Sequence, residues 1–173
     1  GKRAMPALGT LPPAWLDAPM LGAALRRVTQ GEGLAALSLH YGHPMGDTCL
    51  RMVAAELRNH VGRAGELVAR YGGEEFAVLL PLVDGERARQ MAQRMCDGVR
   101  SLKIARARSE TAGFVTVSVG VACLQPQSPL AESSAAAQAL LEQADSALYD
   151  AKKAGRDAVA AYAEPGTAPA LRA

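Results

Sequence analysis

The most informative stretch of this sequence is Arg70-Tyr71-Gly72-Gly73-Glu74-Glu75-Phe76. Apolar runs at 67–71 and 76–80 flank the double glycine, and this pattern predicts a β-hairpin. Gly72 and Gly73 have no Cβ atom, so they reach turn dihedrals freely and let a flat ring or a phosphate approach the backbone. Adjacent carboxylates at such a tip repel one another unless a cation uses them, and they are suitable ligands for Mg²⁺. An ordinary exposed turn with solvated charges is the alternative for these four residues taken alone.

Helical and strand patterns alternate on either side of this hairpin. Apolar residues at helical spacing predict helices over four segments, which are 20–28, 47–61, 86–99 and 135–154. Short apolar or alternating runs predict strands at 34–39 and 114–122. Asp47 is placed to be the N-cap of its helix, and Gly155 is placed to stop the last one. Together these segments predict an α+β or α/β sandwich, with a mixed central β-sheet flanked by helices.

The two ends of the sequence carry helix and strand breakers instead of periodic patterns. Four prolines within residues 1–19 predict an N-terminal linker. A Pro- and Gly-containing stretch predicts that residues 163–173 form a C-terminal tail. One domain is therefore expected over 20–162. Because the sequence begins with glycine and not methionine, we expect it to be a piece of a longer protein.

The composition is that of a globular protein, with 49% apolar and 21% charged residues in 173. A net charge of +2 gives no argument for nucleic acid or an anionic membrane as a partner. No apolar run reaches the length of a membrane helix and no stretch resembles a signal peptide, so a cytoplasmic domain is expected. Cys49, Cys96 and Cys123 form no metal-binding pattern and are expected to be buried free thiols.

Four motifs in order resemble the GGDEF family of diguanylate cyclases. They are the hairpin stretch in the family's GGEEF variant, Tyr41–Asp47 (similar to YGHxxGD), Val117–Val121 (similar to SxGxA) and Ala144–Arg156 (similar to ADxALYxAKxxGR). The resemblance covers about residues 20–162. It implies a nucleotidyl-cyclase-like, palm-like fold and the condensation of two GTP molecules into cyclic di-GMP and two pyrophosphates. It also implies an antiparallel homodimer, in which each subunit holds one GTP.

The resemblance assigns the chemistry to the hairpin. Glu74 would coordinate Mg²⁺ (or Mn²⁺) and help to activate the attacking 3′-hydroxyl, with Glu75 beside it. Gly72 and Gly73 would line the nucleotide.

The same resemblance assigns the rest of the substrate site. Asp47 would accept hydrogen bonds from the guanine edge, and Leu50 would pack beside the base. Lys152 and Arg156, four apart on one helix face, would bind the triphosphate. A pure helix cap at Asp47 and solvated surface charges at the two basic residues are the alternatives.

A product-binding inhibitory site is expected just before the hairpin. The family places an RxxD motif there, and this sequence has Arg63-Ala64-Gly65-Glu66, with an acid one methylene longer. Arg94 falls at the position of a further inhibitory-site arginine. A working but altered site is the favoured hypothesis, and an exposed Arg63–Glu66 ion pair is the alternative.

Two family motifs are absent from the sequence. A DxDxFKxxND segment, with a metal-binding Asp, is expected between Leu39 and His40, and an LTGLxNR-like turn is expected near Ala18. Either the gene carries true deletions, or mobile residues are missing from the sequence.

Three functions therefore remain open. The first is a diguanylate cyclase domain attached to an upstream sensory or regulatory segment. The second is a catalytically inactive receptor for cyclic di-GMP, and the third is a dimerising scaffold.

Overall fold

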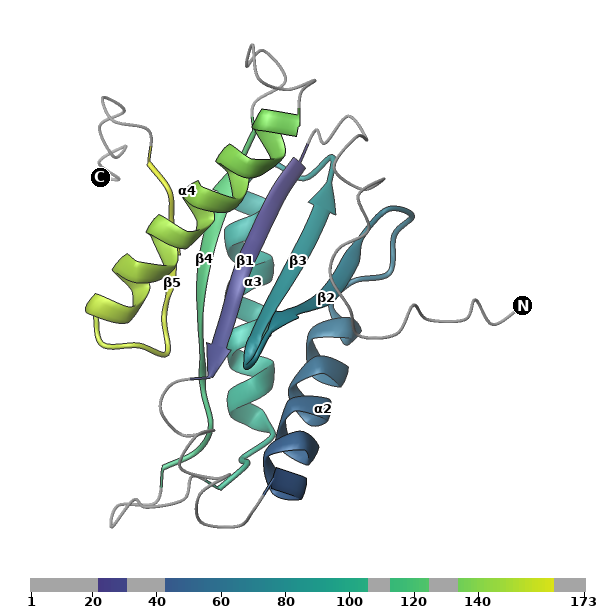
Figure 1. The fold of residues 1–173 in the computed structure, drawn as a ribbon, viewed down its shortest axis with the longest axis vertical. Coiled ribbons are helices and arrows are strands. Elements are labelled where there is room, and N and C mark those ends of the chain that lie inside the picture. The colour runs from purple at the N-terminus through teal and green to yellow at the C-terminus, as the bar shows by residue number, and fades with distance from the viewer. Residues whose placement is uncertain (1–21, 31–42, 106–112, 125–133, 164–173) are drawn as a thin grey trace.

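The computed structural model describes residues 22–30, 43–105, 113–124 and 134–163 of the chain. Its elements in chain order are β1 (Gly22–Gln30), α2 (His43–Asn59), β2 (Leu67–Gly72), β3 (Glu75–Pro81), α3 (Gly85–Ser101), β4 (Val117–Cys123), α4 (Ser134–Lys153) and β5 (Val159–Ala161) (Figure 1). Among these residues, no helix is long and apolar enough to cross a membrane.

The strands form one five-stranded sheet in the order β2-β3-β1-β4-β5. The β2–β3, β3–β1 and β1–β4 pairs are antiparallel, and the β4–β5 pair is parallel. The predicted mixed sheet is therefore confirmed. The hairpin is confirmed as well, because β2 and β3 pair antiparallel on either side of a turn at Gly73 and Glu74.

Helices cover both faces of this sheet, which gives the expected sandwich (Figure 1). The larger core lies between the sheet and helices α2 and α3, where Phe76, Val78 and Val119 contact residues such as Leu57 and Met95. A smaller core lies under α4 on the opposite face and joins Leu79, Ala122, Leu140 and Ala144. The alternation of Val78 and Leu79 between the two cores follows from the period of two in a strand.

Helix α4 lies directly on the backbone of β4 at Gly120. A Cβ atom added to Gly120 would meet the carbonyl oxygen of Ala144 and the backbone of Leu148. A glycine is required here because no side chain fits between the helix and the strand. This contact fixes α4, and hence its C-terminal end, relative to the sheet.

The prediction of a helix over 20–28 is wrong. Residues Gly22–Gln30 form β1, which lies between β3 and β4 and pairs with both. A central strand forms backbone hydrogen bonds along both edges, and this pairing outweighs the helical spacing of a short apolar segment. The predicted strand at 34–39 lies outside the described residues, as do 1–19 and most of 163–173.

The other predicted elements are found with small changes in their bounds. Helix α3 and helix α4 agree closely with 86–99 and 135–154. The predicted strand over 114–122 is β4, which begins three residues later at Val117, although Phe114 still forms an isolated antiparallel bridge with Ala105. The three-residue strand β5 was not predicted, because so short a segment carries no periodicity.

The expectation that the three cysteines are free thiols is confirmed, and the expectation of burial is confirmed for two of them. Cys49 and Cys96 are buried and Cys123 is half-buried, and all three are free thiols. Burial raises the pKa of the Cys96 thiol to about 12. Such a thiol is protonated at neutral pH and is therefore a structural residue.

Candidate functional site

The tip of the β2–β3 hairpin is a two-residue turn. Strand β2 ends at Gly72 and β3 begins at Glu75, so Gly73 and Glu74 make the connection. Gly73 has a φ of +52°, which disfavours residues with a side chain. Gly72 does not take a positive φ, so the expectation that both glycines serve turn dihedrals holds only for Gly73. A Cβ atom at either glycine would meet nothing within 4 Å, so the surface over the tip is open.

Arg70 ties the turn to the body of the hairpin. Its Nε atom donates a hydrogen bond to the carbonyl oxygen of Gly73 at 2.8 Å. The strand register places Arg70 opposite Phe76 and Gly72 opposite Glu75, so Tyr71 is the extra residue of a bulge. The bulge and this hydrogen bond together set the direction in which Glu74 leaves the turn.

The pKa of the Glu74 carboxyl depends on its burial and on two charged neighbours. Burial raises the pKa of the Glu74 carboxyl, the Lys152 ammonium lowers it, and the adjacent Glu75 carboxylate raises it. The net result is a pKa above the ordinary value of 4.5. The fold therefore brings Lys152, from the last turn of α4, close to the acidic tip.

A cavity of about 280 Å³ lies between α2 and the hairpin strands. It is lined by Asp47, Leu50, Arg51, Ala54, Arg58, Val68, Arg70 and Phe76. Two of these residues, Asp47 and Leu50, were predicted to contact a nucleobase. Because Arg70 lines the cavity and also bonds to Gly73, the cavity borders the hairpin tip. Its size is near the lower end of the roughly 300–1,000 Å³ of small-molecule sites.

Asp47 is not the N-cap of its helix. Helix α2 begins at His43, so Asp47 lies within the helix, where its side chain is exposed. The apolar pattern starts at Leu50, so no periodic signal marks the preceding turn, His43-Pro44-Met45-Gly46, as part of the helix. A helical position beside the cavity leaves the Asp47 carboxylate available to a ligand.

Three basic cavity residues were not identified from the sequence. Arg51 and Arg58 lie on α2, four and eleven residues after Asp47, and Arg70 lies on β2. The helical spacing of the first two places them on the face that carries Asp47, and this spacing was the available signal. With Asp47, they give the cavity both acceptors and donors.

The C-terminal end of α4 departs from prediction at Arg156. The helix ends at Lys153, so Lys152 and Arg156 do not share one helix face. The Gly155 amide donates to Lys152 at 3.3 Å and the Arg156 amide donates to Ala151 at 3.2 Å, a Schellman ending with Gly155 at φ +117°. Arg156 follows in the turn with a φ of 63° and an exposed side chain.

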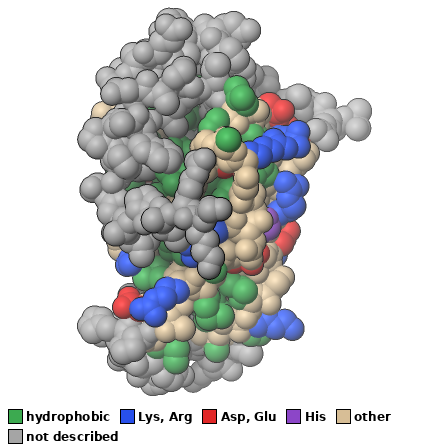
Figure 2. Space-filling view, turned by 90° about the vertical axis from the view of Figure 1, so that its right-hand side faces the viewer, with side chains coloured by type: hydrophobic (Ala, Val, Ile, Leu, Met, Phe, Trp, Pro, Cys, Tyr) green, Lys and Arg blue, Asp and Glu red, His purple; other side chains and the backbone are tan. Residues whose placement is uncertain are grey.

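The predicted inhibitory-site residues lie on α3 and on the loop between α2 and β2. The Glu66 carboxylate accepts hydrogen bonds from the backbone amides of Gly62 at 2.8 Å and Arg63 at 2.9 Å. Glu66 therefore caps its own loop. Its carboxylate bonds to the Arg63 backbone amide, which differs from the alternative of an ion pair with the Arg63 guanidinium. Both Arg63 and Arg94 have exposed side chains. Figure 2 shows several exposed Lys and Arg side chains on the face of the domain that it draws.

The donor set at the hairpin suits a metal ion that arrives with phosphate. No group of three or more His, Cys, Asp or Glu side chains that could hold a metal is found among the residues the structure describes. Magnesium, however, is commonly held by one or two carboxylates, with phosphate oxygens and water as the other ligands. Glu74 and Glu75 are adjacent, and a cation would offset both their repulsion and the burial of Glu74.

These features define a class of protein: an α/β sandwich with a cavity beside an acidic glycine hairpin and basic residues nearby. The sequence model described as "Diguanylate cyclase, GGDEF domain" matches residues 32–158. The chain therefore belongs to the GGDEF family.

Curated relatives agree with this assignment. The chain is 38% identical over 117 residues to diguanylate cyclase DgcP of Pseudomonas aeruginosa, covering 68% of this chain and 16% of that protein. It is 37% identical over 119 residues to response regulator PleD of Caulobacter vibrioides, covering 69% of this chain and 25% of that protein. The chain thus spans a quarter or less of these two relatives.

Solved structures have the same fold. The coiled coil and GGDEF domain of DgcB from Caulobacter crescentus, in complex with c-di-GMP, superposes with a TM-score of 0.68 at 27% identity, over 84% of this chain and 76% of that one. The GGDEF domain of PA1120 from Pseudomonas aeruginosa gives a TM-score of 0.61 at 31% identity, over 82% and 77%. The active GGEEF domain of a diguanylate cyclase from Vibrio cholerae shares the fold, with a TM-score of 0.70 at 20% identity over 88% and 94%.

Proposed function

We propose that this chain is the catalytic domain of a diguanylate cyclase, which condenses two GTP molecules into cyclic di-GMP. The observation that carries the proposal is the half-buried Glu74 carboxylate, close to Lys152 and next to a cavity that Asp47 lines. An acid, a cation and a base-sized cavity are the parts that a nucleotidyl transfer on GTP needs. The family and the curated cyclases among its relatives support this chemistry.

In the proposed reaction, the guanine enters the cavity and the phosphates lie over the hairpin tip. The 3′-oxygen of each GTP forms a bond to the α-phosphorus of the other, and at each α-phosphorus the bond to the bridging oxygen breaks, so that two pyrophosphates are released. The hydroxyl proton passes to Glu74, whose raised pKa makes it a better base than an ordinary carboxylate. Lys152 and Arg156 would offset the triphosphate charge, and a bound Mg²⁺ or Mn²⁺ would stabilise the charge that develops on the phosphates.

The two nucleotides must meet, so we propose that the active form is a homodimer in which each subunit supplies one GTP. We also propose that residues 20–162 form the domain, that it works in the cytoplasm, and that a regulatory segment precedes it. Two similar solved structures support regulation of such a domain: that of DgcB includes a coiled coil with the GGDEF domain. The other is diguanylate cyclase SiaD in complex with its activator SiaC, with a TM-score of 0.64 at 31% identity over 82% of this chain and 50% of that one.

The direct test is incubation with GTP and Mg²⁺ and detection of cyclic di-GMP, with wild type, Glu74→Gln and Glu142→Gln. Glu142 is an exposed carboxylate on α4 and serves as the matched control. Wild type and Glu142→Gln should produce the dinucleotide, and Glu74→Gln should lose about a hundred-fold or more in rate. Equal turnover in the three proteins would contradict the assignment of Glu74.

A role as a cyclic di-GMP receptor is the second candidate, and the 62–66 loop favours it. Glu66 fixes this loop through two backbone amides and leaves the Arg63 guanidinium exposed for a phosphate or a guanine. Titration calorimetry with cyclic di-GMP should show binding by wild type and a loss in Arg63→Ala and Arg94→Ala. Binding that survives both substitutions would place the dinucleotide elsewhere.

A further inference from the structure

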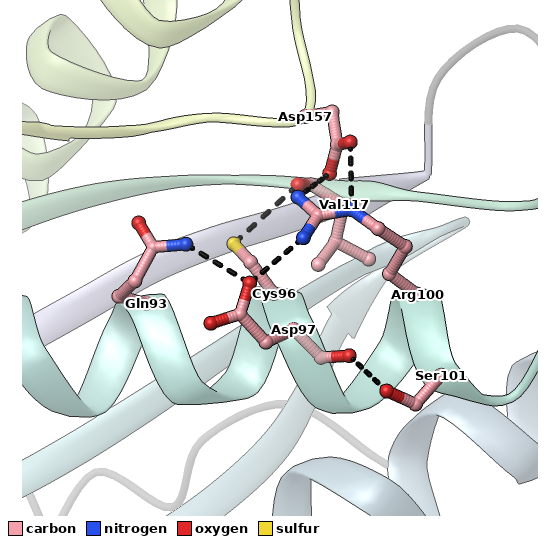
Figure 3. Close-up of polar contacts among 7 residues, drawn as sticks. All are labelled: Gln93, Cys96, Asp97, Arg100, Ser101, Val117 and Asp157. Carbon is pink, nitrogen blue, oxygen red and sulfur yellow. Dashed lines mark hydrogen bonds and ion pairs between the residues drawn. The ribbon is translucent and has the colours of Figure 1, made fainter.

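Arg100, in the last turn of α3, is paired with two carboxylates at once (Figure 3). Its Nε and Nη2 atoms donate to the two oxygens of Asp157, at 3.0 and 2.9 Å. Its Nη1 atom donates to Asp97 at 2.8 Å, and Asp97 also accepts from Gln93 at 3.1 Å. Asp97, which Gln93 holds in turn, therefore helps to orient the guanidinium for its bidentate contact with Asp157.

Asp157 belongs to a turn that follows α4 and runs through three successive residues with positive φ. The angles are +117° at Gly155, 63° at Arg156 and 48° at Asp157. Glycine takes such angles without penalty, whereas arginine does so only when its surroundings impose it. The Arg156 amide donates the last hydrogen bond of the helix end. The next backbone hydrogen bond of this segment is the one that the Ala158 carbonyl oxygen accepts from the Val119 amide, at 2.9 Å. Between them, the contact with Arg100 is what holds the Asp157 side chain.

We propose that Arg100 is a positioning residue for nucleotide binding, which acts through Asp157 to present Arg156 to the triphosphate. This inference rests on the proposed function, because it takes Arg156 to bind phosphate. Arg100 and Asp157 come from different elements, α3 and the α4–β5 turn, so their pairing fixes the turn against the body of the domain. Arg156 directly precedes Asp157 in the chain. Holding Asp157 in place therefore also sets the direction in which the Arg156 side chain leaves the backbone.

A purely electrostatic role makes the opposite prediction for one variant. Asp157→Asn removes a negative charge near the triphosphate, so electrostatics alone would tighten GTP binding. Positioning predicts weaker binding, because the neutral amide loses one oxygen of the bidentate contact. Asparagine tolerates a positive φ, so this substitution leaves the turn residue itself suitable.

The test measures the affinity for GTP·Mg²⁺ and for GMP by calorimetry in wild type, Arg100→Ala, Arg100→Lys, Asp157→Asn and Arg156→Ala. Arg89→Ala is the matched control, since Arg89 forms an i,i+3 pair with Glu86 at 2.9 Å on the same helix and with similar exposure. We expect Arg100→Ala and Asp157→Asn to weaken GTP binding about five-fold, with Arg100→Lys between them and wild type. GMP affinity and thermal stability should match those of Arg89→Ala, because an exposed pair contributes little to folding.

A double variant distinguishes an effect of Arg100 that acts through Arg156 from a direct attraction between Arg100 and the triphosphate. In the Arg156→Ala background, Arg100→Ala should cause no further loss of GTP affinity. If Asp157→Asn tightens GTP binding, or if Arg100→Ala still weakens it without Arg156, the positioning role is wrong while the cyclase proposal stands. If wild type binds no GTP, the proposed function fails, and this inference falls with it.

Discussion

Lys152, at the end of α4, lies close enough to Glu74, at the tip of the β2–β3 hairpin, to lower the pKa of the Glu74 carboxyl. Burial raises the same pKa and is the larger effect. Lys152 thus partly offsets the effect of burial on the protonation of the proposed base, although it lies far from Glu74 in the sequence. This electrostatic interaction links the acidic hairpin to the basic end of α4.

Replacing Lys152 should therefore move the pH dependence of the reaction. In Lys152→Met the carboxyl of Glu74 loses its counter-charge, so its pKa rises further and the acid limb of kcat/KM shifts to higher pH. Affinity for GTP should also fall about ten-fold, since the variant lacks a proposed partner of the triphosphate. The measurement is the pH profile of cyclic di-GMP formation.

Lys153→Met is the control for this prediction. The Lys153 ammonium lies over the ring of Tyr149, 5.0 Å from its centroid, and it does not affect the Glu74 pKa. Acid limbs that coincide in the two variants would show that Lys152 does not act on Glu74.

Glu74 should also make the stability of the fold depend on pH. Its folded-state pKa lies above the unfolded value, so the folded chain holds the proton more tightly. The stabilisation is fully present below the unfolded pKa and is lost as the pH rises through the folded pKa. Glu74→Gln should therefore match wild type near pH 4 and exceed its Tm at pH 7, by about 2 °C for a partly exposed group.

Thermal unfolding of Glu74→Gln and Glu142→Gln at both pH values checks this expectation. The exposed control should show no such gain on going to pH 7. A Glu74→Gln variant that is less stable than wild type at pH 7 would mean that the carboxylate is stabilised in the folded chain.

Alanine substitutions at Gly120 and Gly72 should separate an effect on core packing from an effect on ligand access. Gly120→Ala places a methyl group against the backbone of Ala144 and Leu148, so it should destabilise the fold by about 3 kcal/mol. Gly72→Ala meets nothing within 4 Å and takes no positive φ, so it should change stability by about 1 kcal/mol at most. Denaturant unfolding measures both effects.

The two substitutions should have the opposite order of effect on nucleotide affinity. A methyl group at Gly72 projects over the open hairpin tip, so we expect Gly72→Ala to weaken GTP binding. Gly120→Ala, measured at a temperature at which the variant is folded, should leave GTP affinity unchanged. An unchanged GTP affinity in Gly72→Ala would mean that the nucleotide does not approach this part of the backbone.

The sequence predicted the hairpin, α3 and α4 because their signals are local. Glycines mark the turn, and a long apolar face marks each helix. It failed at Gly22–Gln30, where pairing with β3 and β4 decides the structure and only partners distant in sequence supply it. The cavity residue Arg70 and the Arg100–Asp157 pair were missed for the same reason, since neither contact is visible until the strands and helices are in place.

Thiol reactivity offers a check that does not depend on function. Burial raises the pKa of the Cys96 thiol to about 12 and also raises that of Cys123, which is half-buried. The reactive species is the thiolate, so native protein at pH 8 should label slowly, with Cys123 first. Mass spectrometry of protein alkylated with and without denaturant measures the order. Rapid labelling of Cys96 in the native state would contradict its buried position against the carbonyl of Val117.

Asp47 offers the sharpest test of what enters the cavity. A carboxylate accepts from both the N1 and N2 hydrogens of guanine, whereas an asparagine side chain presents one acceptor and one donor. Asp47→Asn should therefore lose about ten-fold in affinity for GTP and gain affinity for xanthosine triphosphate, which carries an oxygen in place of the 2-amino group. Because Asp47 is exposed, its replacement should leave the Tm unchanged. Competition between the two triphosphates on wild type and variant measures the exchange of preference. A variant that keeps the GTP preference of wild type would show that Asp47 does not contact the base, and the cavity would then have to hold another part of the nucleotide.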